Sequence, residues 1–284
     1  MIRRIGQPHR TDSRTTWFAT VAFGATAPGA GSPIRRRLVN FDPRAARGDT
    51  GPMRIVRLRT LAILLSCSAF PIAAAGNTVT LALDDASVVT PHNVTVKAVR
   101  HAGSDALEVR QAGQIKGFDP DTFAYIPGLD FHDGTIEVDV AGSPLPSALP
   151  AARGFVGVAF RIDVAGGTFA SEGLYVRPTN GRADDQLRRN HSTQYFSYPD
   201  YDFDRLRREA PGQYESYVDV VPDEWIHLRI EVAGATAKFY VNGATQPTLI
   251  VRDLKHGTDA HGTVGLWAGN GANCHFRNLS IRTS

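Results

Sequence analysis

Residues 225–243 read WIHLRIEVAGATAKFYVNG, and this stretch decides the fold that we expect. Apolar residues occupy every second position on both sides of Gly234, which is the period of a β-strand with one buried face. Their rows are Ile226, Leu228, Ile230 and Val232, followed by Ala237, Phe239 and Val241. Gly234 can adopt a positive φ angle, and Asn242-Gly243 is a dipeptide typical of hairpins. The stretch therefore predicts two consecutive antiparallel strands.

The same alternation extends over most of residues 76–284, with Gly, Pro, Asp and Asn between the runs. The expected strands are 78–83, 94–100, 106–111, 134–140, 155–163, 173–177, 215–221, 225–232, 237–242, 248–252, 263–268 and 275–282. Helix signals are almost absent, apart from one turn at 184–189. Two stacked sheets account for the apolar rows, so we expect an all-β chain folded as an antiparallel β-sandwich, or jelly roll.

The first 75 residues lack this pattern. Residues 53–75, MRIVRLRTLAILLSCSAFPIAAA, combine a methionine, a basic stretch, a short apolar core and a small-residue end, which is typical of a secretory signal peptide. Because such a signal works at an N-terminus, we expect translation to start at Met53 and residues 1–52 to be a disordered, non-native upstream extension. An Arg-rich organellar transit segment is the alternative. Residues 76–284 are then the mature β-sandwich domain.

This signal predicts export to the periplasm or the extracellular space. The apolar run that starts at Leu61 is shorter than the roughly 20 residues that span a bilayer, so no membrane span is expected. The tetrapeptide Leu64-Leu65-Ser66-Cys67 resembles a lipoprotein cleavage box. Anchoring through a lipid on Cys67 is the less favoured alternative.

The net charge changes once these residues are set aside. Residues 1–75 hold 12 of the 31 Lys and Arg residues and 3 of the 28 Asp and Glu residues, which leaves residues 76–284 with 19 basic and 25 acidic groups. A net charge of −6 argues against a nucleic-acid partner, which requires a basic face. Cys274 is the only cysteine after the signal, so no intrachain disulfide is expected in the mature domain.

Residues 172–204, EGLYVRPTNGRADDQLRRNHSTQYFSYPDYDFD, differ from their neighbours because tyrosines, arginines, aspartates, amides and a histidine crowd together. This mixture suits recognition of a polar ligand with apolar faces, as a sugar is. The alternative is an ordered loop whose aromatic residues pin it to the sandwich.

Several segments together resemble a known family: GTIEVDV (134–140), GFVGVAFR (154–161), EGLYVRP (172–178), PDEWIHLRIEV (222–232), AKFYVNG (237–243), GTVGLWAGNG (262–271) and FRNLSI (276–281). The chain resembles the concanavalin A-like lectin/glucanase superfamily. Within it the chain is most similar to the 3-keto-disaccharide hydrolase-like family, which is itself similar to family 16 glycoside hydrolases, and more distantly to laminin-G-type modules. The resemblance implies a carbohydrate ligand or substrate. The strand that matches EGLYVRP commonly offers a glutamate and a glutamine in that family, where this chain has Tyr175 and Arg177.

Glycosidic-bond hydrolysis is the activity that the resemblance favours, and it needs two carboxyl groups about 5 to 10 Å apart. Glu137 and Asp139 share one face of a strand, roughly 7 Å apart by strand rise. Glu172 precedes Tyr175 on its strand. These three carboxyl groups are the candidate acids, bases or nucleophiles.

Elimination from a uronic acid is a second chemistry. Arg177 would neutralise the substrate carboxylate, while Tyr175, His191 or Tyr195 would move the proton. The chemistry suits the replacement of a family carboxylate by Tyr175.

A non-catalytic binding module is the third alternative, with Trp267 in the exposed phase of its strand for stacking on a sugar, unless it packs under residues 178–212. The expected lining of the ligand site is Arg161, Tyr175, Arg177, His191, Tyr195, Tyr201 and Trp267. We expect no cofactor and no catalytic metal, and only the acidic turn at 200–204 would suit a structural calcium ion. The sequence sets no expectation for the oligomeric state.

Overall fold

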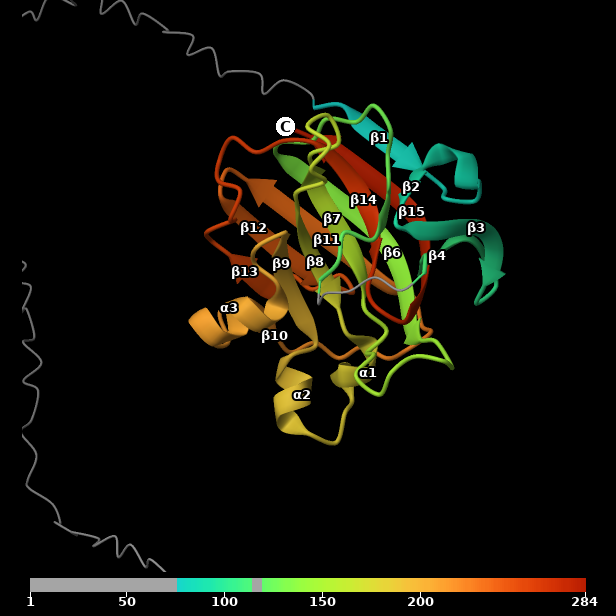
Figure 1. Cartoon of the computed structure of the whole chain (residues 1–284), viewed down its shortest axis with the longest axis vertical. Coiled ribbons are helices and arrows are strands. Elements are labelled where there is room, and N and C mark those ends of the chain that lie inside the picture. Colours follow the sequence, from blue (N-terminus) through green and yellow to red (C-terminus); the bar gives the residue numbers. More distant parts are fainter. Residues whose placement is uncertain (1–75, 114–118) are drawn as a thin grey trace, which may run out of the picture. The chain divides into compact units, whose positions relative to one another are not determined.

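The computed structural model describes residues 76–113 and 119–284, which form two antiparallel sheets stacked face to face (Figure 1). Sheet A has the order β13-β12-β11-β6-β15-β4-β3, and β1 pairs with β15. Its strands are β1 (Thr78–Leu81), β3 (Val94–His101), β4 (Ser104–Gln111), β6 (Gly134–Pro144), β11 (Ile226–Ala233), β12 (Thr236–Val241), β13 (Leu249–Val251) and β15 (Ala272–Thr283). The predicted all-β sandwich is confirmed.

Sheet B has the order β10-β9-β8-β7-β14-β5-β2. Its strands are β2 (Thr90–His92), β5 (Phe123–Tyr125), β7 (Val156–Ile162), β8 (Ser171–Val176), β9 (Thr193–Tyr198), β10 (Glu215–Ser216) and β14 (Thr263–Ala268). The helices are a 3-10 turn at Ala86–Val88, α1 (Pro178–Gly181), α2 (Gln186–Asn190) and α3 (Phe203–Glu209). Helices α1 and α2 lie below the sheets in the view of Figure 1, close to the end of β8.

The hairpin read from residues 225–243 is present as β11 and β12, with Ile230 opposite Phe239 and Val232 opposite Ala237. On its other side, β11 pairs with β6 so that Ile230 lies opposite Ile136. The apolar rows of both sheets are buried between them in one continuous core, which supplies most of the apolar burial that stabilises a domain of this size.

A second apolar layer covers the outer face of sheet B. Its buried members are Phe123, Ala159, Ile162, Tyr175, Phe196 and Trp267, and Phe155, Phe169 and Tyr198 pack against them. Trp267 is only 1% exposed, and its Nε1 donates a 2.9 Å hydrogen bond to the Pro120 carbonyl oxygen. The expectation that Trp267 offers an exposed stacking surface is therefore wrong: the alternating phase identified the outer face, but other segments cover that face.

Residues 178–212 hold more regular structure than the sequence predicted. β9 pairs with β8 over six residues, and α3 is a seven-residue helix, whereas the strand expected at 215–221 is reduced to Glu215–Ser216. Five of the six residues of β9 are buried, so the strand lacks the polar-outward alternation by which a half-exposed strand is recognised. The acidic turn that precedes α3 caps that helix, because the Asp202 side chain accepts a hydrogen bond from the Arg205 backbone N–H.

The upstream extension at 1–52, the signal peptide at 53–75 and the alternative lipid site at Cys67 lie outside the described residues. Within the part of the chain that is described, no helix has the length and apolar character needed to span a membrane.

Candidate functional site

The carboxylates of Glu137 and Asp139 project from β6 on the outer face of sheet A, as their strand phase predicted. Asp139 accepts hydrogen bonds from His227 Nδ1 at 2.9 Å, Arg277 Nε at 3.1 Å and Asn278 Nδ2 at 2.9 Å. Burial alone would raise the pKa of Asp139, but these three donors outweigh it and hold that pKa below its usual value. Asp139 is therefore a fully engaged carboxylate, and the sandwich separates it from the outer face of sheet B.

Glu172 projects into the core between the sheets rather than toward Tyr175. Its Oε1 accepts hydrogen bonds from the Tyr195 hydroxyl at 2.8 Å and from the His256 backbone N–H at 3.1 Å, and its Oε2 lies 3.5 Å from Arg161 Nη1. Burial raises the pKa of Tyr195 well above its usual value, so its hydroxyl keeps its proton. Glu172, Tyr195 and Arg161 therefore form a buried internal network, and their predicted place in an open ligand site is wrong.

A bulge at the end of β7 explains why the strand phase misplaced Arg161. Arg161 has a φ of 53°, and the pairing with β14 shifts register between Thr263 and Gly265. A bulged residue breaks the alternation of side chains between the two faces. The Arg161 guanidinium consequently turns inward, where it donates hydrogen bonds to the carbonyl oxygens of Gly234 and Gly257.

Tyr175 forms the centre of a buried polar network on the outer face of sheet B. Its hydroxyl donates a 2.9 Å hydrogen bond to Asp119 Oδ1 and accepts a 2.8 Å hydrogen bond from Arg177 Nη2. The other oxygen of Asp119 accepts a hydrogen bond from the Phe203 backbone N–H. Burial raises the pKa of Asp119 to about 6, although Arg177 and these two donors oppose the rise.

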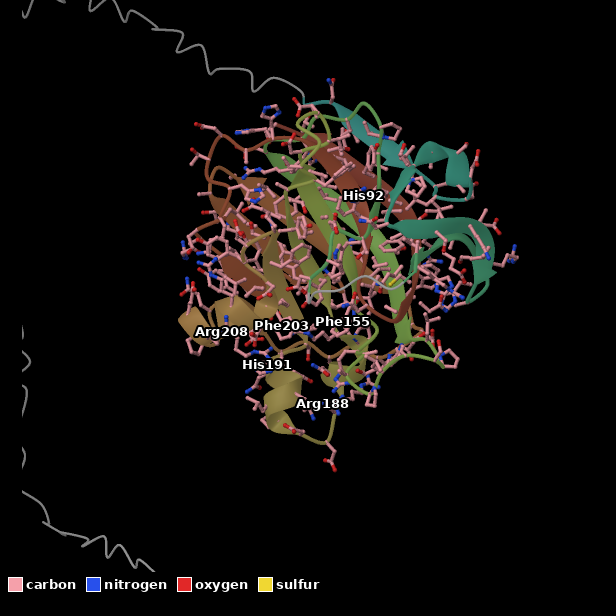
Figure 2. All side chains as sticks on the ribbon, viewed as in Figure 1. His92, Phe155, Arg188, His191, Phe203 and Arg208 are labelled. Carbon is pink, nitrogen blue, oxygen red and sulfur yellow. The ribbon has the colours of Figure 1, made fainter. Side chains whose placement is uncertain are left out.

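The strand β7 makes room for this network. Gly157 lies opposite Tyr175 on one side and Trp267 on the other, and a Cβ at this glycine would come within 2.5 Å of Tyr175. Across the glycine, the rings of Tyr175 and Trp267 pack with their centroids 4.7 Å apart. The Arg177 guanidinium lies over the rings of Phe155 and Phe203, which are labelled in Figure 2. The polar network is thus enclosed by aromatic rings.

A pocket of about 760 Å³ opens beside this network, and we call it the first pocket. Its lining is Gln111, Gly113, Asp119, Pro120, Leu145, Ser147, Ala148, Leu149, Ala151, Ala152, Phe155, Tyr175, Phe203, Trp267, Asn270 and Gly271. An apolar pocket with a carboxyl of shifted pKa and a few convergent polar groups is the usual form of a ligand or active site.

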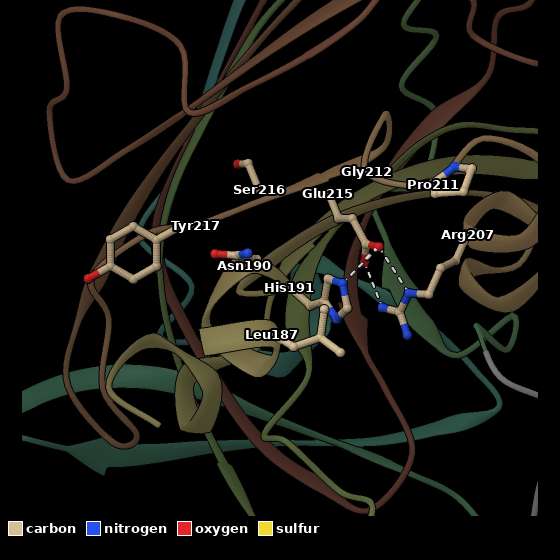
Figure 3. A pocket seen from close by; sticks show the side chains of 9 residues that line it. All are labelled: Leu187, Asn190, His191, Arg207, Pro211, Gly212, Glu215, Ser216 and Tyr217. Carbon is tan, nitrogen blue, oxygen red and sulfur yellow. Dashed lines mark hydrogen bonds and ion pairs between the residues drawn. The ribbon is translucent and has the colours of Figure 1, made fainter. Parts of the chain in front are cut away.

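A second pocket of about 530 Å³ contains His191, Arg207 and Glu215 (Figure 3). Arg207 donates two hydrogen bonds to the Glu215 carboxylate, at 2.9 and 2.6 Å, and His191 Nε2 lies 3.2 Å from Glu215 Oε1. Burial lowers the pKa of His191 and the charges of Arg207 and Arg177 add to this effect, whereas Glu215 opposes it. Leu187, Asn190, Pro211, Gly212, Ser216 and Tyr217 complete the wall.

The buried Arg177 side chain lies between the two pockets and contacts a residue of each, Tyr175 and Glu215. While Nη2 binds the Tyr175 hydroxyl, Nη1 donates to the His191 carbonyl oxygen at 3.1 Å and lies 3.8 Å from Glu215 Oε2. Tyr175, Arg177 and His191, which the sequence grouped for elimination chemistry, therefore come together, although the His191 ring lines the other pocket. Tyr201 stands apart from this network, with its ring under the Arg205 guanidinium.

The sequence did not single out Asp119 and Glu215, and both are central to the network. Asp119 falls in a stretch without strand alternation, between residues 106–111 and β5, and this break in the pattern is the only signal that marked it. Glu215 was placed at the start of a strand that is shorter than expected.

The described residues contain no group of three or more His, Cys, Asp or Glu side chains arranged to hold a metal ion. In the acidic turn that was considered for calcium, Asp202 caps α3 and Asp204 pairs with Arg208.

A family model described as the 3-keto-alpha-glucoside-1,2-lyase-like domain matches residues 97–282. No curated protein matches the chain.

Among solved structures, the carbohydrate-binding module CBM66 from Bacillus subtilis is similar at 16% identity and a TM-score of 0.45, over 68% of this chain and 95% of that one. A protein of unknown function with a galectin-like fold, also from Bacillus subtilis, has 12% identity and a TM-score of 0.46, over 74% and 97%. A putative glycosyl hydrolase from Parabacteroides distasonis has 14% identity and a TM-score of 0.43, over 72% and 99%.

Proposed function

This chain belongs to the family of 3-keto-alpha-glucoside-1,2-lyase-like domains, and from that membership and the Tyr175 network we propose that it cleaves the glycosidic bond of a 3-keto-α-glucoside by elimination. The membership confirms the family resemblance read from the sequence and makes the chain a carbohydrate-related β-sandwich domain. Elimination was one of the chemistries considered for Tyr175 and Arg177, with a uronic acid as the substrate. The family description replaces the uronic carboxylate with a ketone as the group that acidifies the neighbouring C–H bond.

The reaction has a simple electron balance. A ketone at C3 acidifies the proton on C2, and a base removes that proton. The electrons of the C2–H bond form a C1–C2 double bond as the C1–O bond breaks, and the leaving oxygen takes up a proton. The protein must therefore supply a proton acceptor near C2 and positive charge near the developing enolate.

The observation that carries the proposal is the position of the Tyr175 hydroxyl between a carboxylate and a guanidinium, at the wall of the first pocket. Burial raises the pKa of Tyr175 well above its usual value, so the hydroxyl holds its proton until a neighbour accepts it. Asp119, with a pKa of about 6, is ionised at neutral pH and can accept that proton as Tyr175 takes the one from C2. Arg177, whose Nη2 is 2.8 Å from the Tyr175 oxygen, supplies positive charge beside the point where the proton leaves C2 and the enolate forms.

The hydrolytic mechanism expected from the sequence receives less support. Of its three candidate carboxyl groups, Glu137 and Asp139 lie on the outer face of sheet A and Glu172 points into the core. Glu137 and Asp139 share one face, but Asp139 is held by three hydrogen-bond donors, and Glu172 lies on the other side of sheet A from this pair. The binding-module alternative loses its stacking platform, because Trp267 is buried.

The test is incubation of the full chain with a 3-keto-α-glucoside in D2O, with the matching unoxidised α-glucoside as the control. Elimination predicts an ultraviolet-absorbing enone from the keto sugar, deuterium at C2 of the product after hydration, and no reaction of the control, whose C2–H is not acidified. Reducing ends without an enone and without deuterium would indicate hydrolysis instead. Binding without any product would indicate a carbohydrate-binding module.

We also propose that the domain acts outside the cytoplasm, in the periplasm or the extracellular space. The support is the secretory pattern of residues 53–75. N-terminal sequencing of the natural protein tests this proposal: a mature chain that begins near residue 76 would agree with it, whereas one that retains residues before Met53 would contradict it.

A further inference from the structure

The second pocket combines exposed apolar side chains with fixed polar groups. In the part of the chain that the structure describes, four large hydrophobic side chains are exposed, and two of them, Leu187 at 66% and Tyr217 at 42%, line this pocket. Arg189 Nη2 donates a 2.9 Å hydrogen bond to the Tyr217 hydroxyl, and its guanidinium lies over the ring. Tyr217 is therefore held in place at the rim although it is exposed to solvent.

The polar wall of the pocket is prepared before any ligand arrives. Glu215 is almost fully buried, and it orients Arg207 through Nε and Nη2 and His191 through Nε2. This arrangement leaves Nη1 of Arg207 and Nδ1 of His191 as the nitrogens that Glu215 does not engage. A fixed donor and a second ring nitrogen beside two apolar side chains match a ring that carries hydroxyl groups on its edge and C–H groups on its face.

We propose that the second pocket binds a neutral pyranose ring, the sugar unit that leaves when the glycosidic bond is cut. A neutral ring fits better than an anion because Glu215 already neutralises Arg207 through two hydrogen bonds. The assignment of this ring as the leaving unit rests on the proposed elimination activity, whereas the binding of a sugar in the pocket does not.

The position of the pocket supports this role. Arg177 reaches the Tyr175 hydroxyl with one nitrogen and approaches Glu215 with the other, so the proposed reaction centre and the second pocket are one guanidinium apart. The Phe203 ring lies beside Arg177 and Arg207, with centroid distances of 5.2 and 5.1 Å, and forms part of the wall between the pockets. Arg177 is itself buried and lines neither pocket, so the two pockets are neighbours on either side of this side chain, and two adjoining sugar units of one substrate would occupy one pocket each.

The binding test uses methyl α-D-glucopyranoside, which carries no ketone and is not cleaved, with the full chain and titration calorimetry or saturation-transfer NMR. Tyr217→Ala and Leu187→Asp are expected to weaken binding about tenfold, since each removes an apolar contact with the ring. Ile250→Ala is the matched control, because Ile250 is another exposed large hydrophobic side chain and lies on β13, outside both pockets. Wild-type affinity in both pocket variants, or binding of inorganic phosphate that displaces the glucoside, would overturn the proposal.

The kinetic test separates this inference from the proposed activity. If elimination occurs, Tyr217→Ala should raise the KM for a 3-keto disaccharide about tenfold relative to the KM for a 3-keto methyl glucoside, because only the disaccharide has a leaving sugar. An equal effect on both substrates would overturn the leaving-unit role. If no elimination occurs at all, the proposed activity fails, while the glucoside titration still decides whether the pocket binds a sugar.

Discussion

The hydroxyl of Tyr175 donates a 2.9 Å hydrogen bond to Oδ1 of Asp119, in a buried environment where the tyrosine pKa is raised and the aspartate pKa is about 6. A tyrosine that holds its proton thus lies against a carboxylate that is ionised at neutral pH. Transfer of that proton to Asp119 would make the tyrosine oxygen basic only when a substrate supplies a replacement proton. In the proposed elimination, the proton therefore moves from C2 to the Tyr175 oxygen, and Asp119 accepts the tyrosine proton.

Substitution Tyr175→Phe should lower kcat/KM for a 3-keto-α-glucoside by roughly 100- to 1,000-fold, the usual contribution of a positioned acid–base group. The ring and its packing against Trp267 are retained, so the unfolding free energy should fall by about 1.5 to 3 kcal/mol, the usual contribution of a hydrogen bond to a charged group. Initial rates and urea denaturation measure the two effects. A variant that keeps wild-type rates would show that the hydroxyl is structural.

The rate of the wild-type protein should rise with pH through about 6, as Asp119 ionises and becomes able to accept a proton. The Arg177 guanidinium stabilises the ionised form of Asp119 and so lowers its pKa. Arg177→Gln should therefore raise the pKa of Asp119 and move the rising part of the pH–rate profile to higher pH. Profiles of kcat/KM against pH give the comparison. Arg182→Gln, which breaks an exposed pair with Asp219, is the control and should leave the rising part where it is.

Asp119 should also make the fold less stable at neutral pH than at acid pH. Its folded pKa of about 6 lies above the ordinary value of 3.8, so its contribution to stability is greatest below pH 3.8 and is lost as the pH rises through 6. At about 1.4 kcal/mol per pKa unit, the ionised carboxyl costs about 3 kcal/mol at pH 7. Asp119→Asn removes this dependence.

The measurement is the unfolding free energy of both proteins at pH 4 and pH 7. From pH 4 to pH 7 the unfolding free energy of the wild type should fall by roughly 2 kcal/mol relative to that of the variant, because the unfolded carboxyl, with a pKa of 3.8, is already partly ionised at pH 4. Asparagine does not titrate, so the effect of its own contacts on stability is the same at each pH and cancels. A difference that is flat with pH would contradict the raised pKa.

His275 should have the opposite effect. It is buried against His101, with ring centroids 3.8 Å apart, and burial followed by the charge of His101 lowers its pKa to about 4 from 6.5. A lowered folded pKa stabilises the protein above pH 6.5, and this contribution is lost as the pH falls toward 4. The unfolding free energy of His275→Gln should therefore fall less than that of the wild type as the pH is lowered from 7 to 4, by no more than about 3 kcal/mol. His261→Gln, which changes an exposed histidine, is the control for the same denaturation series.

The sequence predicted those features of the fold that depend on one buried strand face. The β11–β12 hairpin, the rows on β6 and β7 and the outward position of Glu137 and Asp139 all follow from a period of two residues. The sequence predicts no strand at 193–198, where β9 lies, because both faces of this strand are buried and polar and apolar positions do not distinguish them. Arg161 was misplaced because a bulge changes the phase without leaving a sequence signal.

The candidate site was predicted in its residue types and only partly in its geometry. Tyr175, Arg177 and His191 were grouped by chemistry, and the fold brings them together through contacts between β8, α2 and β10. Asp119 bonds to Tyr175, which lies 56 residues away in the sequence, and a local sequence pattern cannot predict a contact at that separation. Burial of Trp267 likewise depends on a distant segment, because Pro120 accepts its N–H.

Two glutamate substitutions separate the catalytic and structural interpretations of the original carboxyl candidates. Glu172→Gln removes one of the two carboxylates beside the buried Arg161 guanidinium and leaves Asp133 at 3.0 Å as the other, so the unfolding free energy should fall by about 1 to 3 kcal/mol. Glu137 is partly exposed on the opposite face of the sandwich, and Glu137→Gln should change stability by less than about 1 kcal/mol. Neither carboxyl group faces the first pocket. We therefore expect folded Glu172→Gln, assayed well below its lowered melting temperature, and Glu137→Gln to retain both kcat and the rise of the pH–rate profile near pH 6. A loss of kcat in Glu137→Gln without a change in stability would restore the carboxylate mechanism and contradict the role given to Asp119 and Tyr175.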